Sequence, residues 1–437
     1  MQTSAIDIVK NLQNKGFKAY FAGGCVRDML LGRHAKDFDI VTNATPDQIE
    51  QIFPKTIPIG KQFGLIQVHQ DGHQFEVATF RSDSGYSDGR RPDAVIFTNA
   101  EEDAKRRDFT INGMFYDPTT EQIHDYVGGQ TDLQAHLVRF IGEPEKRIQE
   151  DHLRLLRAIR FRNQFDFQYE PATYNAIKKF APLIKEKVST ERIREEICKM
   201  LMDKTRPSAA FEDLSQLGLL ELILPELEKL RGCAQPYEYH HEGDVWTHTM
   251  AAIDSLPPDA SLAARLATLF HDIGKPDTFK LAERIRFDSH APIGAKITRR
   301  IMKRLNFNSN ITETVTWSIE HHMMMASYFE MPEKRLLHWF GNPNFPTLLN
   351  LMYADAAGTT PTDLSFYQKV ADLYKIKTRK AIKAIKPYLS GSEIMAITGL
   401  KAGAKVGELK EQLFQLQLDH QIKSKKSAEL WLRKNFK

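Results

Sequence analysis

The first third of the chain alternates short apolar runs with turn residues. β-branched and aromatic residues are concentrated at positions 19–21, 38–41, 65–68, 75–80 and 94–97, and Gly, Asp and Pro residues separate these runs. Short runs of this composition are typical of strands. The pattern therefore predicts an N-terminal domain of mixed helices and strands that ends near residue 140.

After Pro144 the pattern becomes helical. Apolar residues recur at spacings of three and four over residues 151–165, 170–180, 189–202 and 207–217. Turn residues mark a boundary near residue 235, further helices follow to about residue 358, and the lysine-rich C-terminal region has short helical patterns at 405–419 and 427–434. The predicted fold class is α+β, with a mixed domain followed by an all-α remainder.

Composition narrows the class of protein. At about 150 residues per domain, 437 residues correspond to about three domains. No apolar run approaches the roughly 20 residues that span a bilayer, and we recognise no secretory signal, so we expect a cytoplasmic protein with no membrane partner. The three cysteines are too far apart for a metal or redox motif, and a net charge of +4 permits nucleic-acid binding without requiring it. No feature of the sequence indicates an oligomeric state.

A candidate phosphate and metal site follows the first predicted strand. Gly23 and Gly24 precede a helical stretch that contains Arg27, so their backbone amides and this guanidinium are suited to a phosphate. Asp37 and Asp39 flank one residue of the next predicted strand, and their carboxylates therefore project from the same face. Two adjacent anions repel each other unless a cation neutralises them, and oxygen ligands favour Mg²⁺. The alternatives are a plain glycine turn and a solvated pair of aspartates.

Two later segments add candidate residues to this site. Glu76, in the strand predicted at 75–80, is a candidate third carboxylate, although it could equally be an ordinary strand glutamate. Arg106, Arg107 and Asp108 precede an apolar stretch, and such groups suit contacts with a triphosphate and a ribose.

These motifs, in this order, resemble those of the class II tRNA nucleotidyltransferases, the family that contains CCA-adding enzymes and bacterial poly(A) polymerases. The resemblance runs through roughly the first 165 residues. It is carried by Gly23 to Gly32, Asp37 to Asp39, Arg106 to Met114, Gly128-Gly129 with Asp132-Leu133, and Glu150 to Arg154 with Arg157 and Arg160. Gly113 departs from the alanine expected in many members.

The resemblance implies a catalytic polymerase-β-type nucleotidyltransferase head, expected at 1–140, and a helical neck and body for base selection and RNA binding, expected at 141–234. Together with the boundary near residue 235, the His and Asp pattern of the following helices and the lysine-rich C-terminal region, this predicts an HD domain at 235–360 and a basic helical tail that binds tRNA at 361–437. The resemblance also implies addition of C, C and A from CTP and ATP to the 3′ end of tRNA without a nucleic-acid template, with two Mg²⁺ ions at Asp37 and Asp39. An A-only enzyme, a poly(A) polymerase and an HD phosphohydrolase (a 2′,3′-cyclic phosphodiesterase or phosphatase) stay open as alternatives.

Four charged residues at every third position line one broad polar face of the helix predicted from residue 151. Cytosine and adenine present an amino donor beside a ring-nitrogen acceptor, whereas uracil and guanine present a carbonyl in place of the amino group. Asp151 suits the amino group and Arg154 the ring nitrogen, so this pair selects CTP and ATP. The resemblance implies that Glu150 orients Arg154 and that Arg157 and Arg160 contact the nucleotide. The alternative is a solvated amphipathic helix.

A loop is predicted at 79–92 from its Gly, Ser and Asp content. It matches the flexible loop that, in the family, is linked to the switch from C to A addition, and its presence argues against an enzyme that adds only the two cytidines.

A second candidate metal site lies in the helical part of the chain. His248, His271, Asp272 and Asp355 match the four-ligand pattern of HD-domain phosphohydrolases, which bind divalent metals such as Mg, Mn, Ni or Co. His290 and His321 are the candidates for a second metal position. We expect His241 and His322 to be structural more often than ligating. A degenerate, non-catalytic HD domain is the alternative.

Overall fold

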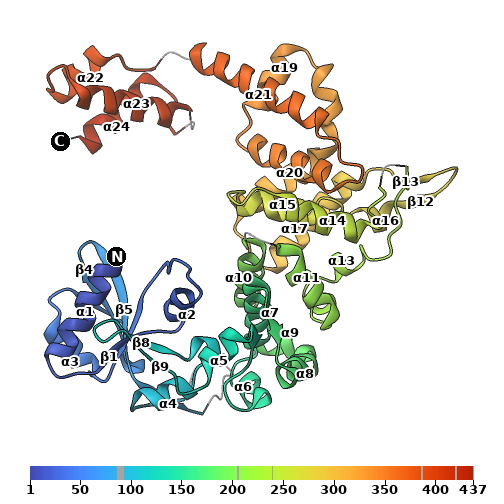
Figure 1. The fold of residues 1–437 in the computed structure, drawn as a ribbon. Helices are drawn as coiled ribbons and strands as arrows, with labels where there is room; N and C mark the ends of the chain where they lie inside the picture. The colour runs from blue at the N-terminus through green and yellow to red at the C-terminus, as the bar shows by residue number, and fades with distance from the viewer. Residues whose placement is uncertain (86–92, 204–205, 239, 385–386, 419–420, 437) are drawn as a thin grey trace.

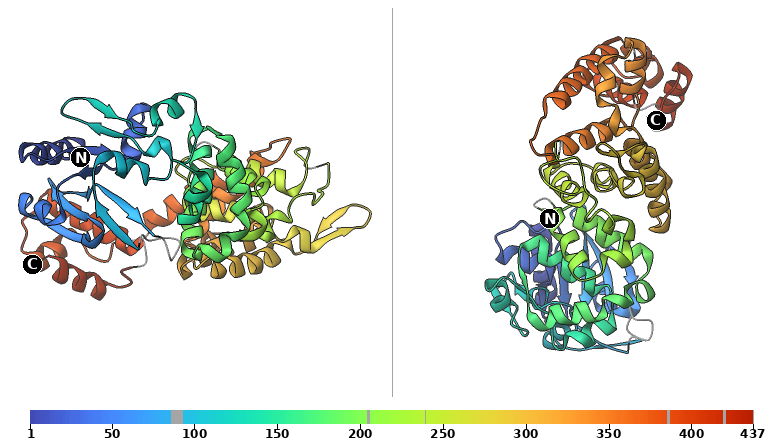
Figure 2. Two further views of the ribbon diagram at one scale, coloured as in Figure 1. Left: turned by 90° about the horizontal axis from the view of Figure 1, so that it is seen from below. Right: turned by 90° about the vertical axis from the view of Figure 1, so that its right-hand side faces the viewer.

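The computed structural model describes residues 1–437 except 86–92, 204–205, 239, 385–386, 419–420 and 437. Figures 1 and 2 show the mixed N-terminal domain, a central group of helices and a second helical domain following one another along the molecule. Part of the loop predicted at 79–92 lies outside the described residues. Residues 81–84 form β6 (Arg81–Ser84), which pairs with β7 (Ala94–Phe97).

The head is built on a seven-stranded sheet. Its strand order is β3-β4-β5-β2-β1-β8-β9, and only β2 and β5 run parallel among the pairs described. The strands are β1 (Ala19–Ala22), β2 (Asp39–Thr42), β3 (Thr56–Gly60), β4 (Leu65–Gln70), β5 (His73–Thr79), β8 (Phe115–Asp117) and β9 (Gln122–His124). The pattern predicted β1, β2, β4, β5 and β7 but not β3, β8 and β9, which are short or exposed.

Successive side chains along the strands point to opposite faces of the sheet, and helices pack on both faces. Phe21 and Ile40 point to the face that packs on α1 (Gln2–Asn14), where Ile8 and Leu12 are fully buried. Tyr20 and its neighbours point to the opposite face and pack with two alanines of α4 (Ala100–Lys105). The sheet is therefore held rigidly, and the site residues at the ends of its strands are held with it.

Helices form the central part of the chain, as the periodicity predicted. They include α6 (Pro144–Glu150), α7 (Arg154–Phe165), α8 (Pro171–Phe180), α10 (Thr190–Leu201) and α11 (Pro207–Gln216). The helix predicted from residue 151 begins only at Arg154. Asp151 has an extended backbone at the end of α6, and its carboxylate accepts a hydrogen bond from the amide of Leu153, so this part of the prediction was wrong.

The next helices surround the second candidate site. They are α14 (Val245–Ser255), α15 (Leu262–Phe270), α17 (His290–Arg304), α18 (Ser309–His321) and α20 (Phe345–Gly358). A hairpin of β12 (Phe279–Leu281) and β13 (Ile285–Phe287) projects from this domain (Figures 1 and 2).

Three C-terminal helices, α22 (Gly391–Thr398), α23 (Ala404–Leu418) and α24 (Lys425–Asn435), form a small bundle with a separate apolar core. Among the helices that the structure describes, none is long and apolar enough to cross a bilayer.

Candidate active site and candidate metal centre

One cavity of about 510 Å³ lies where the head meets α7, and most of the first predicted site lines it. Of the thirteen residues predicted for nucleotidyl transfer, ten line this cavity: Gly23, Gly24, Arg27, Asp37, Asp39, Arg107, Asp108, Asp151, Arg154 and Arg157. Glu76, Glu150 and Arg160 do not. A cavity of this size accommodates a mononucleotide.

The glycine pair makes the close turn that the cavity requires. Gly23 precedes α2 (Gly24–Leu30) with φ of 68°, a backbone conformation that favours glycine. A Cβ atom at this position would lie 3.0 Å from the guanidinium of Arg107. Glycine therefore lets the turn and this guanidinium approach each other at the cavity wall.

The two aspartates occupy the edge of the cavity at the start of β2. Asp39 is the first residue of the strand, Asp37 lies two residues before it, and the intervening Phe38 is buried. Burial, together with the charges of Asp37 and Glu76, raises the pKa of Asp39 to about 6. Glu76 thus acts on the pair from the neighbouring strand β5, although it does not line the cavity. Arg107 opposes this rise, and the clustered carboxylates remain a donor set that suits a divalent metal.

Arginines on the opposite side of the cavity are fixed by buried acceptors. Arg107 pairs with the buried carboxylate of Asp103 at 3.1 Å, and Arg27 donates to the side-chain oxygen of Asn112 at 2.6 Å. Asp108 accepts from Arg157 at 2.8 Å. Burial alone would raise the pKa of Asp108, but Arg157 holds it down at about 2, so the aspartate is charged at neutral pH.

The residues predicted to select the base are held by further ion pairs. Arg154 donates to Glu150 at 2.5 Å, which is the contact that the orienting role of Glu150 requires. Asp151 is bound by two nitrogens of Arg192 at 3.0 and 2.7 Å. Arg192 comes from α10, 41 residues away, and was not among the predicted site residues, because no local pattern distinguishes it from any other arginine on a helix.

The structure places Arg160 outside this cavity. Its Nε donates to the buried carboxylate of Glu196 at 2.6 Å, and its guanidinium lines a different cavity. Arg160 therefore does not line the cavity that holds the other predicted nucleotide-binding residues, contrary to the prediction that it contacts the nucleotide. The reason is the helical drift of a three-residue spacing, which turns Arg160 away from the face that carries Arg154.

Gly113, the departure noted in the sequence, lies directly behind the site. A Cβ atom there would lie 2.6 Å from Val127 and 3.0 Å from Ile141. The neighbouring side chains fill the space that an alanine would need.

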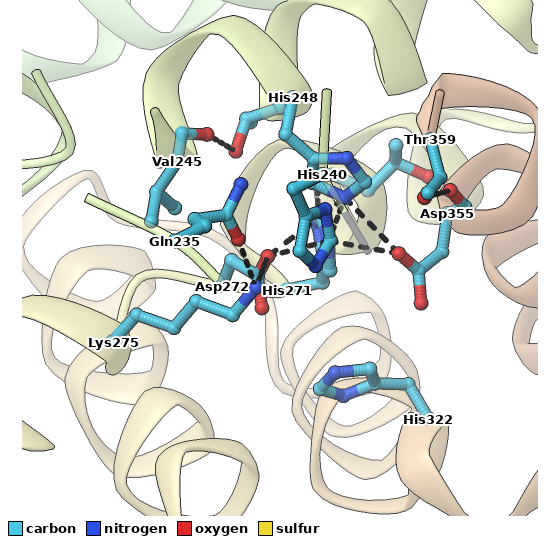
Figure 3. A network of polar contacts seen from close by, with 12 residues as sticks. Gln235, His240, Val245, His248, His271, Asp272, Lys275, His322, Asp355 and Thr359 are labelled. Atoms are coloured by element: carbon cyan, nitrogen blue, oxygen red, sulfur yellow. Dashed lines mark hydrogen bonds and ion pairs between the residues drawn. The ribbon is translucent and has the colours of Figure 1, made fainter. Parts of the chain in front are cut away.

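The second site gathers histidines and aspartates from five helical segments. His248 comes from α14, His271 and Asp272 follow α15, His290 begins α17, His322 follows α18, and Asp355 comes from α20. The ligand atoms of His248, His271 and Asp355 lie within 4.8 Å of one another, and so do those of Asp272, His290 and His322. Figure 3 shows His248, His271 and Asp355 facing a common point.

All four histidines of this centre are oriented in the same way. Each Nδ1 contacts an acceptor outside the centre, which is Glu242 for His248 and a backbone oxygen for His271, His290 and His322. The Nε2 atoms consequently face inward, and those of His248 and His271 lie 3.3 Å apart, as do those of His290 and His322. Such outer contacts are typical of histidines that bind metals, and this arrangement fits two adjacent divalent ions.

The prediction for His321 was wrong, because His322 occupies the place expected for it. The ring of His321 packs against those of Trp317 and Trp339, with centroids 4.8 and 4.9 Å away. His322 is buried beside His290 where α18 ends. His241, expected to be structural, stacks on Tyr237.

One further group at this centre was not predicted. Lys275, four residues after His271, contacts Asp272 at 2.6 Å and lines a cavity of about 730 Å³ that opens on the histidines. Arg284 and Arg286 of the β12–β13 hairpin also line this cavity, together with four carboxylates, those of Glu238, Asp272, Asp288 and Asp355. The lining therefore offers both cations and metal-binding carboxylates.

Three family models match successive parts of the chain. They are the poly(A) polymerase head domain over residues 19–139, the probable RNA- and SrmB-binding site of polymerase A over 166–230, and the HD domain over 239–356. The chain is thus similar to poly(A) polymerases in its head and central region and to HD domains in the region that follows. Its architecture is a polymerase head followed by helical domains that include an HD domain. Head and HD domain both point to the use of divalent metal ions.

Curated relatives and solved structures that resemble this chain are named CCA-adding enzymes. A CCA-adding enzyme of Lactobacillus helveticus is 48% identical over 197 residues, which are 45% of this chain and 49% of the relative. That of Bacillus licheniformis is 40% identical over 263 residues, 59% of this chain and 65% of the relative. The chain thus spans about half the length of the Lactobacillus relative and less than two thirds of the Bacillus one.

A crystal structure of the Bacillus stearothermophilus CCA-adding enzyme in complex with CTP has a TM-score of 0.66 and 26% identity to this chain. The match covers 99% of this chain and 97% of that one. The Thermotoga maritima CCA-adding enzyme complexed with tRNA shares the fold, with a TM-score of 0.53 and 19% identity.

The two adjacent histidines provide a test of the metal centre. We expect His322→Ala to abolish binding at one of two divalent sites, because it removes an inward Nε2, whereas His321→Ala leaves the number of bound ions unchanged. Calorimetric titration of the metal-free chain with Mn²⁺ measures both the number of ions and their affinity. Equal loss of binding in the two variants, or no loss in His322→Ala, would contradict this assignment.

Proposed function

We propose that this chain adds C, C and A to the 3′ end of tRNA, using CTP and ATP and no nucleic-acid template. The observation that carries the proposal is that one mononucleotide-sized cavity holds both the carboxylate pair Asp37 and Asp39 and the base-selecting pair Asp151 and Arg154. The names of the relatives favour complete CCA addition over A-only addition or poly(A) synthesis. Such an activity belongs in the cytoplasm, which agrees with the expectation from the sequence.

In this proposal the head performs nucleotidyl transfer. The 3′ oxygen of the RNA bonds to the α-phosphorus, the bond from that phosphorus to its β-bridging oxygen breaks, the hydroxyl proton leaves to water, and pyrophosphate departs. Asp37 and Asp39 would hold two Mg²⁺ ions, with Glu76 as a further carboxylate beside them. When bound, such ions activate the attacking hydroxyl and stabilise the leaving pyrophosphate. Arg27 and Arg107 would bind the phosphates.

Base selection would come from the neck. The carboxylate of Asp151 has lone pairs left beside those that Arg192 and the Leu153 amide use, so it can accept from the amino group of cytosine or adenine. Arg154, held by Glu150, would donate to the ring nitrogen. Uracil or guanine would set a carbonyl against the carboxylate and leave two acceptors unpaired, which costs about 1–3 kcal/mol.

We further propose the domain limits given by the sequence, 1–140, 141–234, 235–360 and 361–437. The C-terminal helices carry many lysines and form their own core, which suits a module that binds the tRNA backbone. The partners would then be tRNA, CTP and ATP.

The proposal is tested with three tRNA substrates that end at the discriminator base, after both cytidines, or at the complete CCA. We expect addition of CCA, of A and of nothing, respectively, and loss of all addition in Asp39→Ala with tRNA binding retained. Gel analysis with single and mixed nucleotides measures this. Long A tails on the complete tRNA would favour a poly(A) polymerase, and addition only after CC would favour an A-only enzyme.

The base-selecting pair is tested by changing its hydrogen-bonding pattern. Asp151→Asn adds a donor that can face a carbonyl, so we expect UTP and GTP incorporation to rise relative to CTP and ATP, by about 1–3 kcal/mol in discrimination. Arg154→Ala should reduce incorporation of CTP and ATP and also reduce the discrimination against UTP and GTP. Relative kcat/KM values for the four nucleotides measure the effect. If both variants slow all four nucleotides equally, selection resides elsewhere.

A second activity is favoured by the geometry of the HD centre. Six inward ligands beside the basic side chains of Lys275, Arg284 and Arg286 suit metal-dependent hydrolysis of a phosphate ester. We propose a phosphatase or 2′,3′-cyclic phosphodiesterase activity there, with Mg, Mn, Ni or Co as the metal.

The double variant His271→Ala, Asp272→Ala separates the two activities. We expect it to lose hydrolysis of 2′,3′-cyclic nucleotides and phosphomonoesters while nucleotide addition continues, because the ligands lie in a different domain. Release of phosphate or of the opened monoester is measured with each of the four metals. Absence of hydrolysis by the unmodified protein with every metal would mark the centre as structural.

A further inference from the structure

A second cavity of about 440 Å³ lies beside the nucleotide cavity and is lined mostly by cations. Arg33 and Lys36 come from the loop before β2 in the head, Arg160 comes from α7, and Lys199 comes from α10. Asp203 is the acidic residue among those described in its lining. The cavity therefore suits an anion.

Two stacked rings contact arginines of both the basic cavity and the nucleotide cavity. The rings of Phe161 and Phe165 lie 6.0 Å apart with an angle of 15° between their planes. Arg27, which lines the nucleotide cavity, contacts both rings, at 5.2 and 4.4 Å from their centroids. Arg160 contacts the first ring at 4.1 Å and Arg33 the second at 5.0 Å, and both line the basic cavity. The two cavities are thus linked through these rings.

The charges of the basic cavity are only partly neutralised. Glu196, a buried carboxylate, accepts from Arg160 at 2.6 Å and from Lys199 at 2.9 Å. Burial disfavours its charge, but the two cations hold the pKa of Glu196 below its usual value. Arg33 and Lys36 are exposed, and no carboxylate of the described part of the chain forms an ion pair with either. Both therefore have charge available for a ligand.

The position of Lys36 links the basic cavity to the reaction centre. It directly precedes Asp37 in the chain, and the side chains of these two residues line different cavities. An anion beside Lys36 would consequently lie next to the carboxylate pair but outside the nucleotide cavity.

We infer that the basic cavity binds a phosphodiester of the RNA strand whose 3′ hydroxyl attacks the nucleotide. The inference rests on the proposed function, because the reaction needs a second substrate. The nucleotide cavity has groups for one triphosphate and one base, so the RNA end must reach the carboxylates from another direction. The basic cavity opens beside them and offers backbone contacts that do not depend on sequence.

Departing pyrophosphate has the same anionic chemistry and is the other candidate ligand. The two are distinguished by which kinetic constant changes. A cavity for RNA phosphate affects the Kd and KM of the RNA, whereas a cavity for pyrophosphate affects the KM of pyrophosphate in the reverse reaction.

The test uses Arg33→Gln, Lys36→Gln and their double variant in the full-length protein. Lys10→Gln is the matched control, because it removes one exposed lysine from α1, outside both cavities. Fluorescence anisotropy with a labelled minihelix RNA ending in CC gives the Kd. We expect the double variant to weaken binding about tenfold and to lower the slope of log Kd against log salt by about 0.7–1 per cation removed. The control should match the unmodified protein.

A phosphate scan locates the contact. Neutral methylphosphonates replace the last three phosphodiesters of the RNA one at a time. At one of these three positions, the methylphosphonate should weaken RNA binding by the unmodified protein. The same replacement should not weaken binding by the double variant any further, because that variant already lacks the cations that contact this phosphate. The KM for ATP should stay unchanged in every variant.

Three results would overturn the inference: an unchanged Kd for RNA in the double variant, equal losses with every methylphosphonate in all proteins, or a rise confined to the KM of pyrophosphate. Because anisotropy needs no turnover, it tests this cavity even if the unmodified protein adds no nucleotide. Absence of nucleotide addition would refute the proposed function and leave the RNA-binding inference standing.

Discussion

The ion pair between Asp108 and Arg157 joins the two halves of the candidate active site. Asp108 belongs to the head and Arg157 to α7, so this contact sets the phosphate-binding groups against the base-selecting ones. Asn112 extends the link, since it donates to Asp108 and accepts from Arg27. Both side chains are partly buried, so loss of either partner leaves a partly desolvated charge without its counterion. The shape of the cavity therefore depends on this pair.

The charge of Asp108 makes this link durable at neutral pH. Its pKa of about 2 in the folded protein lies below the ordinary value of about 3.9. A depressed pKa of a carboxyl contributes stability above the unfolded pKa, and this contribution is lost as the pH falls from about 4 to about 2. In the same way α10 supports the neck, because Arg192 holds Asp151 and Glu196 holds Arg160. Arg265 of α15 donates to the carbonyl of Leu201 at the end of α10, which ties the HD domain to the same helix.

Local patterns predicted most elements of the fold but not the contacts between them. Five strands and the main helices follow from the spacing of apolar residues. The helix expected from Asp151 begins at Arg154, because the aspartate side chain binds a nearby amide and ends the preceding helix. The helical period of apolar residues does not show which of His321 and His322 points inward, because the helix ends there. The packing of Trp317 against His321 leaves His322 to face the metal centre. Arg192 acts across 41 residues of sequence, which no local pattern reveals.

The central claim, that one cross-domain ion pair unites chemistry and base selection, is tested most directly by a double-mutant cycle. Single-turnover rates of cytidine addition are measured for Asp108→Asn, Arg157→Gln and the double variant. The account predicts that each single change slows addition at least tenfold and that the double variant is no slower than the slower single one, because either change breaks the same link. Single variants with unchanged rates, or losses that multiply in the double variant, would contradict it.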